Sequence, residues 1–308
     1  MTIAVTFGLL AAILFALAAH SQKKALAFLD DLSGTFISVA TISIIFWLVA
    51  IWNMRWEFWL SEAILFFALA GLLFPAMGQR FQISSVKHVG PTLTSAFNAF
   101  LPVFAVIPAI LFLDETVTVV QIFGIFILIL GLLMAAIGRG VSMKNKAFYL
   151  LLIPLGAALA RAISQPLTKA GYNLLTEPLF AMLIMATVST AVIGILVLST
   201  GTPRKIISYS KGHVFFILNG FLIGSGILAV QISLIFGTIS LTASLMTTTP
   251  IWTLILSIFI FKNEELKWWH GLVAMIVTTG AILVIVGTLF ICPATYIFPL
   301  ESRVTALA

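Results

Sequence analysis

The sequence predicts an all-α membrane protein of ten transmembrane helices, arranged as two inverted repeats of five helices each. Of its 308 residues, 61% are apolar and only 8% are charged, which is about one third of the charged fraction of ordinary soluble domains. The mean hydropathy is +1.20, so lipid must replace water around much of the exterior. Ten long apolar runs, and polar positions that recur at a fixed spacing, complete the prediction.

The ten apolar runs are each close to the roughly 20 residues that a helix needs to cross a bilayer core about 30 Å thick. The first run lacks the basic start of a secretory signal, so we expect it to remain as the first span. The connections at 114–116 and 237–240 leave room only for tight antiparallel hairpins. The runs cover residues 3–20, 34–53, 62–80, 91–113, 116–138, 147–168, 178–199, 213–236, 239–261 and 268–291.

A shift of 149 residues superposes polar and glycine positions of the second half on the first. The shift predicts a first repeat over 1–140, a second over 147–292 and a short polar tail at 293–308. Five spans per repeat would give the two halves opposite orientations, an arrangement typical of transporters; chance alignment is the alternative. The superposed pairs are Gly71 and Gly220, Gln82 and Gln231, Ser84 and Ser233, Ser95 and Ser244, Glu115 and Glu264, and Gly131 and Gly280.

Basic residues gather on one side of the predicted bundle. Twelve of the sixteen Lys and Arg residues fall in alternate connections, three lie on the side that holds both termini, and Arg161 lies inside a span. The positive-inside rule then places both termini outside the cytoplasm. The net charge of +6, carried near span ends, favours anionic lipid headgroups over nucleic acid as the partner.

Two stretches of the chain resemble a known family. Residues 86–133 read VKHVGPTLTSAFNAFLPVFAVIPAILFLDETVTVVQIFGIFILILGLL, and residues 236–284 read FGTISLTASLMTTTPIWTLILSIFIFKNEELKWWHGLVAMIVTTGAILV. Both have a proline in mid-helix, an acidic hairpin and spaced glycines, and in this they resemble the EamA domain of the drug/metabolite transporter superfamily.

The resemblance implies a multi-pass protein of the inner (plasma) membrane, monomeric or homodimeric, with a central cavity between two inverted units. It implies secondary transport of small organic metabolites by alternating access, with export as one direction and amino acids or related compounds as the first expectation. It implies neither an enzymatic activity nor a cofactor. A membrane-embedded enzyme and a scaffold or channel-like protein without coupled transport are the alternatives.

The sequence departs from the family pattern at two points. Asp114 stands where a glycine usually precedes the hairpin glutamate. The charge distribution also conflicts with the cytoplasmic termini that are common in the family, so the orientation stays open.

Proton relays and metal sites find little support in the sequence. All ten carboxylates fall at or beyond predicted span ends, whereas proton-driven carriers often use a carboxylate buried in the membrane. Facilitated diffusion or exchange is therefore favoured, although a histidine could still carry a proton. There is one cysteine, Cys292, and no HExxH pattern, so neither an intramolecular disulfide nor a metal site is expected.

Arg161 is the one charged residue deep within a span. An isolated guanidinium in hydrocarbon costs several kcal/mol on most scales, so it must have a partner. One interpretation is that Arg161 faces the cavity and binds a carboxylate or phosphate of the substrate through its planar donor fork. The other is that it snorkels to an interface or pairs with carbonyls freed by Pro154 and Pro166.

Neutral amides within or near spans are further candidates for substrate contacts, because amides in lipid need hydrogen-bonding partners. As repeat mates, Gln82 and Gln231 are expected to reach toward the cavity as a symmetric pair. Interhelical hydrogen bonding is the alternative and the commoner use of buried amides. The candidates are Gln79, Gln82, Asn98, Gln165 and Gln231.

Prolines within two spans predict kinked helices, because proline removes a backbone hydrogen bond. They are Pro102 and Pro108 in the fourth span and Pro250 in the ninth. The hydroxyls of Thr247, Thr248 and Thr249, just before Pro250, are candidates for substrate contact. The alternative, which we favour slightly, is that these hydroxyls bond their own backbone.

Overall fold

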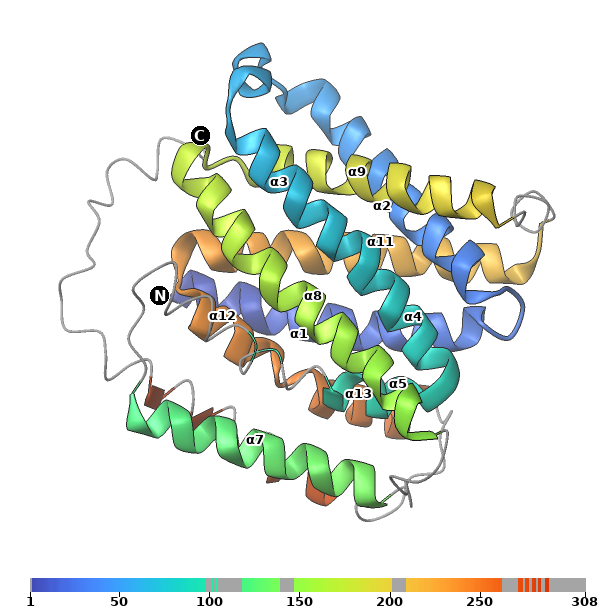
Figure 1. Cartoon of the computed structure of the whole chain (residues 1–308), viewed down its shortest axis with the longest axis vertical. Coiled ribbons are helices and arrows are strands. Elements are labelled where there is room, and N and C mark those ends of the chain that lie inside the picture. Colours follow the sequence, from blue (N-terminus) through green and yellow to red (C-terminus); the bar gives the residue numbers. More distant parts are fainter. Residues whose placement is uncertain are drawn as a thin grey trace.

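The computed structural model describes residues 2–97, 101, 104, 118–138, 147–200 and 209–261, together with 271–273, 275, 276, 279, 280, 282, 283, 286 and 287. Across these residues the chain is a bundle of helices without a strand (Figure 1). Several predicted features lie outside the described residues. They are Asn98, Pro102, Pro108, Asp114, Glu115, Glu264, Cys292 and the tail at 293–308.

The helices follow the apolar runs closely. The elements are α1 (Thr2–Ala25), α2 (Asp31–Asn53), the 3₁₀ turn η1 (Trp56–Leu60), α3 (Ala63–Gly71), the π-helical η2 (Leu72–Met77), α4 (Gly78–Val89), α5 (Pro91–Phe97), α7 (Val119–Gly138), α8 (Ala147–Leu174), α9 (Pro178–Ser199), α11 (Lys211–Phe236), α12 (Ile239–Met246), α13 (Thr249–Leu256) and the π-helical η4 (Ser257–Phe261). Within the described part of the chain, five stretches are long and apolar enough to cross a membrane: 2–25, 31–52, 63–89, 178–199 and 211–236.

Local sequence signals account for several helix ends. The Asp30 carboxylate accepts a hydrogen bond from the Ser33 backbone N–H at 2.9 Å and so caps α2. Pro178 stands in the first turn of α9, where its missing N–H costs nothing. Lys169 of α8 donates to the backbone carbonyls of Leu234 and Gly237, at 2.7 and 2.6 Å, and thereby satisfies the end of α11.

The third span is broken at Phe74 and Pro75, between α3 and α4, a feature that the sequence analysis did not anticipate. Phe74 has extended backbone angles, with φ −148° and ψ 123°, inside the π-helical turn η2. The freed carbonyl groups are satisfied from neighbouring helices. Ser164 of α8 donates to the Ala70 carbonyl at 3.1 Å, and Ser189 of α9 donates to the Gly71 carbonyl at 2.8 Å.

The ninth span is interrupted next to Pro250, where the sequence predicted a kink. Helix α12 ends at Met246, and α13 begins at Thr249 with Pro250 in its first turn. Proline fits the first turn of a helix because no intrahelical partner awaits its N–H there. The chain therefore stops one helix and starts another where the sequence predicted one bent helix.

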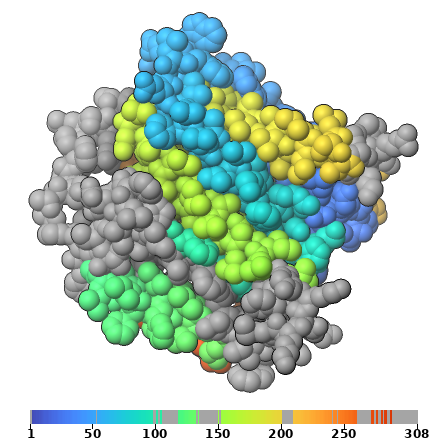
Figure 2. All heavy atoms as spheres, in the orientation of Figure 1, coloured from blue at the N-terminus to red at the C-terminus, as the bar shows by residue number. Residues whose placement is uncertain are grey.

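Three sets of helix contacts dominate the bundle (Figure 1). Helix α1 packs along α11, α2 packs along α9 and α11, and α8 packs along α3 and α4. Figure 2 shows the side chains of α8 packed directly against those of α3 and α4 on the face in view. The main apolar core runs through these helices and includes the fully buried rings of Phe67 and Phe180.

Two glycines bring helix backbones into contact. A Cβ atom on Gly71 would lie 2.6 Å from the backbone Cα and O of Met185 in α9. A Cβ atom on Gly220 would lie 2.6 Å from the backbone O of Ser38 in α2. Small residues at such crossings let helices in lipid approach closely.

We expect Gly71→Ala to lower the stability of the detergent-solubilised protein by about 1–3 kcal/mol, because the new methyl group forces α3 and α9 apart. The matched control is Gly156→Ala in α8, where the nearest atom to the new methyl is Phe81 Cδ2 at 3.4 Å. Thermal unfolding of both variants checks the prediction. Equal melting temperatures for the two variants would contradict it.

Candidate functional site

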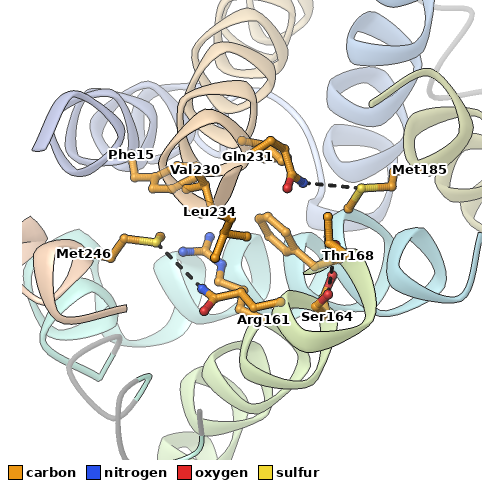
Figure 3. A pocket seen from close by; sticks show the side chains of 12 residues that line it. Phe15, Arg161, Ser164, Thr168, Met185, Val230, Gln231, Leu234 and Met246 are labelled. Carbon is orange, nitrogen blue, oxygen red and sulfur yellow. Dashed lines mark hydrogen bonds between the residues drawn. The ribbon is translucent and has the colours of Figure 1, made fainter. Parts of the chain in front are cut away.

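A small cavity lies at the centre of the bundle, where α1, η2, α8, α9, α11 and α12 meet (Figure 3). Its volume of ≈ 20 Å³ is room for about one water molecule. Helices α8 and α11 each contribute four positions at the spacing i, i+3, i+4, i+7, which is one face of a helix. The lining residues are Phe15, Phe74, Arg161, Ser164, Gln165, Thr168, Met185, Ile227, Val230, Gln231, Leu234 and Met246.

Arg161 is the charged residue of this cavity, and its side chain is held by aromatic rings. It is 4% exposed, and its Cζ lies 4.9 Å from the ring centroid of Phe15 and 4.5 Å from that of Phe74. Cation–π contact of this kind partly compensates a desolvated guanidinium. Among the described residues no carboxylate pairs with Arg161, and its Nε has no hydrogen-bond partner.

The burial and the contacts of Arg161 argue against both parts of the second interpretation, which were snorkelling to an interface and pairing with freed carbonyls. The side chain is buried beside the central cavity, so it does not snorkel to an interface. Within the described part of the chain it donates no hydrogen bond to carbonyls near Pro154 or Pro166. The aromatic partners were not anticipated, because phenylalanine is too common in this chain to single out two rings.

The break in the third span builds the aromatic cover of Arg161. Extended backbone angles at Phe74 direct its ring to the guanidinium, and Gly78 leaves room for that ring, since a Cβ there would lie 2.6 Å from Phe74 Cδ2. Ser164, one turn beyond Arg161, binds the Ala70 carbonyl freed by the break. The same hydrogen bond thus ties α8, which carries the cation, to the segment that covers it.

Gln165 and Gln231 line the cavity from α8 and α11. Each amide nitrogen faces a methionine sulfur: Gln231 Nε2 lies 3.4 Å from Met185 Sδ, and Gln165 Nε2 lies 4.0 Å from Met246 Sδ (Figure 3). Both carbonyl oxygens are buried and have no hydrogen-bond partner among the residues that the structure describes. Ser164 and Thr168 differ from them, since both hydroxyls donate to backbone carbonyls, at 3.1 and 2.9 Å.

Gln79 lies outside the cavity and joins helices to each other. Its Nε2 donates to Asn219 Oδ1 at 3.1 Å, and Ser38 Oγ donates to the same oxygen at 2.9 Å. Asn219 Nδ2 in turn donates to the Ala18 carbonyl at 3.1 Å. This network links α1, α2, α4 and α11, which is the interhelical alternative considered for buried amides. Asn219 was overlooked, although an amide in mid-span was the signal that could have found it.

Gln82 does not accompany Gln231 at the cavity; it is buried in α4 but is not among the lining residues. Two similar hydroxyl contacts lie near these residues: Ser85 Oγ is 2.7 Å from Thr94 Oγ1, and Ser233 Oγ is 2.9 Å from Thr242 Oγ1. A symmetric pair of glutamines at the cavity is therefore not formed among the described residues.

The threonine run before Pro250 does not line the cavity. Thr248 Oγ1 donates to the Leu245 carbonyl at 2.8 Å, and Thr249 Oγ1 donates to the Met246 carbonyl at 2.6 Å. Thr247 is fully buried. The hydroxyls of Thr248 and Thr249 therefore serve the interrupted backbone, which was the favoured alternative, and a role of this run in binding substrate stays a prediction.

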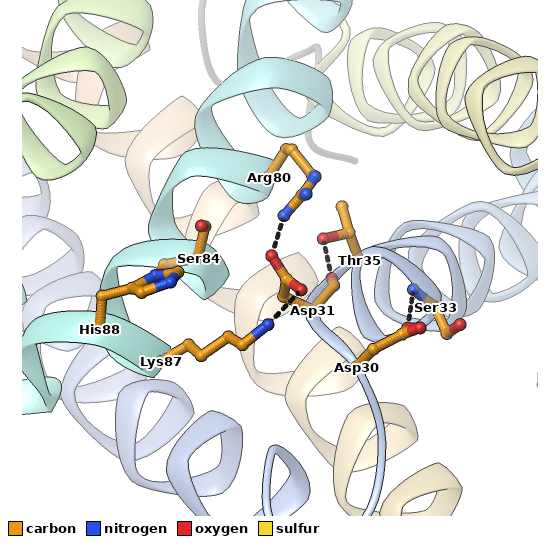
Figure 4. Close-up of polar contacts among 8 residues, drawn as sticks. All are labelled: Asp30, Asp31, Ser33, Thr35, Arg80, Ser84, Lys87 and His88. Atoms are coloured by element: carbon orange, nitrogen blue, oxygen red, sulfur yellow. Dashed lines mark hydrogen bonds and ion pairs between the residues drawn. The ribbon is translucent and has the colours of Figure 1, made fainter. Parts of the chain in front are cut away.

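A cluster of charged side chains joins the start of α2 to α4 (Figure 4), and none of its members lines the cavity. Asp31, at the start of α2, pairs with Arg80 Nη1 at 2.5 Å and with Lys87 Nζ at 3.0 Å, both from α4. Thr35 Oγ1 also donates to the Asp31 carbonyl at 2.7 Å. Two of the basic residues assigned to one side by charge counting therefore meet there, and they share one carboxylate.

Aromatic side chains pack together where η1, α3, α8 and α9 meet. The Phe180 ring of α9 lies 5.6 Å from Phe58 and 5.4 Å from Trp59, between ring centroids, and Tyr172 of α8 lies 5.5 Å from Phe67. These rings belong to the main apolar core or pack against it, and they do not line the cavity.

Comparison with known proteins gives a family that matches part of the chain and solved structures with a similar fold. The EamA-like transporter family matches residues 2–137 of the chain. A solved crystal structure superposes with a TM-score of 0.67 over 92% of this chain and 97% of its own length, at 11% sequence identity. At that identity the likeness shows the fold alone. None of the curated proteins matches the chain.

We expect Arg161→Met to raise the apparent melting temperature of the unliganded protein, equivalent to roughly 1–3 kcal/mol, because it removes a buried cation that lacks a counter-charge. Arg80→Met is the matched control. It should lower the melting temperature, because the carboxylate of Asp31 then keeps only Lys87. Thermal unfolding in detergent checks both variants, and a fall with Arg161→Met as large as that with Arg80→Met would show that Arg161 is structural.

Proposed function

We propose that this chain, whose residues 2–137 belong to the EamA-like transporter family, is a secondary transporter of small organic metabolites that carry an anionic group. Arg161 binds that group in the central cavity, and alternating access exposes the cavity to each side of the inner (plasma) membrane in turn. Amino acids and related compounds are the first class of metabolite to be tested. The observation that carries the proposal is a buried guanidinium beside the cavity without a carboxylate partner among the described residues.

The chemistry of the guanidinium favours an anionic ligand. Its planar fork donates two parallel hydrogen bonds to a carboxylate or phosphate, and such bonds are strong where water is excluded. A charge inside a membrane protein typically marks a substrate pathway because leaving it unpaired is costly. While no substrate is bound, the aromatic rings of Phe15 and Phe74 hold the cation.

Helix packing supports two inverted units of five helices. Under such a repeat α1 corresponds to α8, α2 to α9, and the broken third span to α11. The contact of α1 with α11 then corresponds to that of α8 with α3 and α4, and α2 packs on its own mate α9. The close approach of Gly71 to α9 likewise corresponds to that of Gly220 to α2.

The small size of the cavity supports a closed state in an alternating cycle. Pockets that hold metabolites are usually about 300–1,000 Å³, whereas this cavity measures ≈ 20 Å³. Helices must therefore separate before a metabolite can enter. Helix pairs related by an inverted repeat can rock about a shared centre and open it to one side and then to the other.

Counterflow in proteoliposomes tests the transport function. A thermal-shift screen of the purified protein against metabolite pools first identifies a stabilising compound. Liposomes preloaded with that unlabelled compound should then take up the labelled compound faster than empty ones. The reason is that an alternating site carries unlabelled compound out and returns with labelled compound bound. Uptake at the same rate with and without preload would indicate a channel, and no uptake at all would indicate a scaffold.

Variants of Arg161 test the assignment of the anion site. We expect Arg161→Lys to weaken substrate binding by about tenfold or more, because lysine keeps the charge but loses the planar fork, and Arg161→Ala to abolish binding. Arg55→Ala, at a predicted span end far along the chain, serves as the control for lost positive charge. Unchanged affinity in both Arg161 variants, with normal folding, would remove Arg161 from the binding site.

A further inference from the structure

Two amide oxygens in the central cavity lack the hydrogen bonds that buried acceptors require. Gln165 and Gln231 are 6% and 2% exposed, and within the described part of the chain the carbonyl oxygen of each has no partner. They come from different helices, α8 and α11, and Gln165 lies one helical turn beyond Arg161. A buried acceptor without a donor is unfavourable. The amide oxygens of Gln22, Gln79 and Gln82 are also buried without a partner among the described residues, but only those of Gln165 and Gln231 belong to residues that line the cavity beside Arg161.

The orientation of both amides follows from the chemistry of methionine. A thioether sulfur accepts weak hydrogen bonds and donates none, so the NH₂ group of each amide turns to the sulfur of Met185 or Met246. The carbonyl oxygen is then directed away from the sulfur. Figure 3 shows the Gln231 amide in this arrangement, with its nitrogen on the side of Met185.

The other polar groups of the cavity show which hydrogen-bonding groups still lack a partner. The hydroxyls of Ser164 and Thr168 already donate to backbone carbonyls. What remains is one cationic donor, Arg161, and two neutral acceptors, among walls that are otherwise aromatic, aliphatic or thioether. A plain carboxylate would satisfy the guanidinium but would leave both oxygens without a donor.

We propose that Gln165 and Gln231 determine substrate specificity by accepting hydrogen bonds from an N–H or O–H group carried next to the anionic group that Arg161 binds. The ligand class is then an α-amino or α-hydroxy acid with an apolar side chain, and simple carboxylates are discriminated against. The inference rests on the proposed function, since it assigns the remaining polar groups of the same site.

Four probes with the same branched apolar chain test the specificity of the purified full-length protein. They are leucine, 2-hydroxy-4-methylpentanoate, 4-methylpentanoate and 3-methylbutylamine, and the branched chain suits the walls formed by Ile227, Val230 and Leu234. Equilibrium binding should rank the amino acid and the hydroxy acid at least about tenfold tighter than 4-methylpentanoate, because only they supply donors to the amide oxygens. The amine alone should bind weakest.

The double variant Gln165→Leu, Gln231→Leu should remove this ranking. Leucine and the hydroxy acid should lose about tenfold or more in affinity, while 4-methylpentanoate should keep its affinity within about twofold, so the three acids become similar. Arg161→Lys should instead weaken all three acids together. This split separates the groups that select the donor from the group that binds the anion.

Stability without ligand distinguishes specificity from helix packing. Asn219→Leu is the control, because it removes partners from Ser38, Gln79 and the Ala18 carbonyl, and it should lower the melting temperature clearly. The two glutamine variants should leave the melting temperature of the unliganded protein unchanged or raise it. A fall as large as that of Asn219→Leu would overturn the proposal and make both glutamines structural.

Other outcomes separate the inference from the proposed function. If 4-methylpentanoate binds the native protein as tightly as leucine does, or if none of the three acids binds, the specificity proposal is overturned. Counterflow that depends on Arg161 would still support an anion carrier in either case. Binding of 3-methylbutylamine alone would overturn both, because Arg161 would then not recognise the ligand.

Discussion

A backbone carbonyl that loses its helical partner inside a membrane must find another donor, and this constraint shapes the centre of the molecule. The break at Phe74 frees the carbonyls of Ala70 and Gly71, and hydroxyls from two other helices, on Ser164 and Ser189, satisfy them. Those hydrogen bonds hold α8 and α9 against the broken span. The cavity lies where these helices meet α1 and α11, so its position follows from the hydrogen bonds that satisfy the freed carbonyls.

The broken span also determines the electrostatics of the cavity. Because Phe74 leaves the helical conformation, its ring reaches the guanidinium of Arg161 opposite Phe15. Aromatic faces attract a cation without neutralising it, so the positive charge stays available to a ligand. A carboxylate in their place would form a closed ion pair, and within the described part of the chain no carboxylate pairs with Arg161.

The lining of the cavity divides unequally along the chain. Its polar side chains come from α8 and α11, whereas the aromatic rings of Phe15 and Phe74 come from α1 and η2. The later part of the chain therefore supplies the polar groups of the site, and the earlier part supplies the aromatic cover.

Hydropathy along the chain was enough to predict a multi-pass helical membrane protein and to locate several of the helices that the structure describes, with 178–199 matched at both ends. That success has a simple cause: a span needs about 20 apolar residues whatever packs against it. Arg161 could also be identified, because a lone charge in a span stands out. The lengths of the apolar runs do not encode contacts between side chains of different helices. Such contacts determine the partners of Arg161, the orientation of the two glutamines and the break at Phe74. Only the tertiary structure decided them, because a buried polar group takes whichever donor, acceptor or ring the neighbouring helices bring within reach.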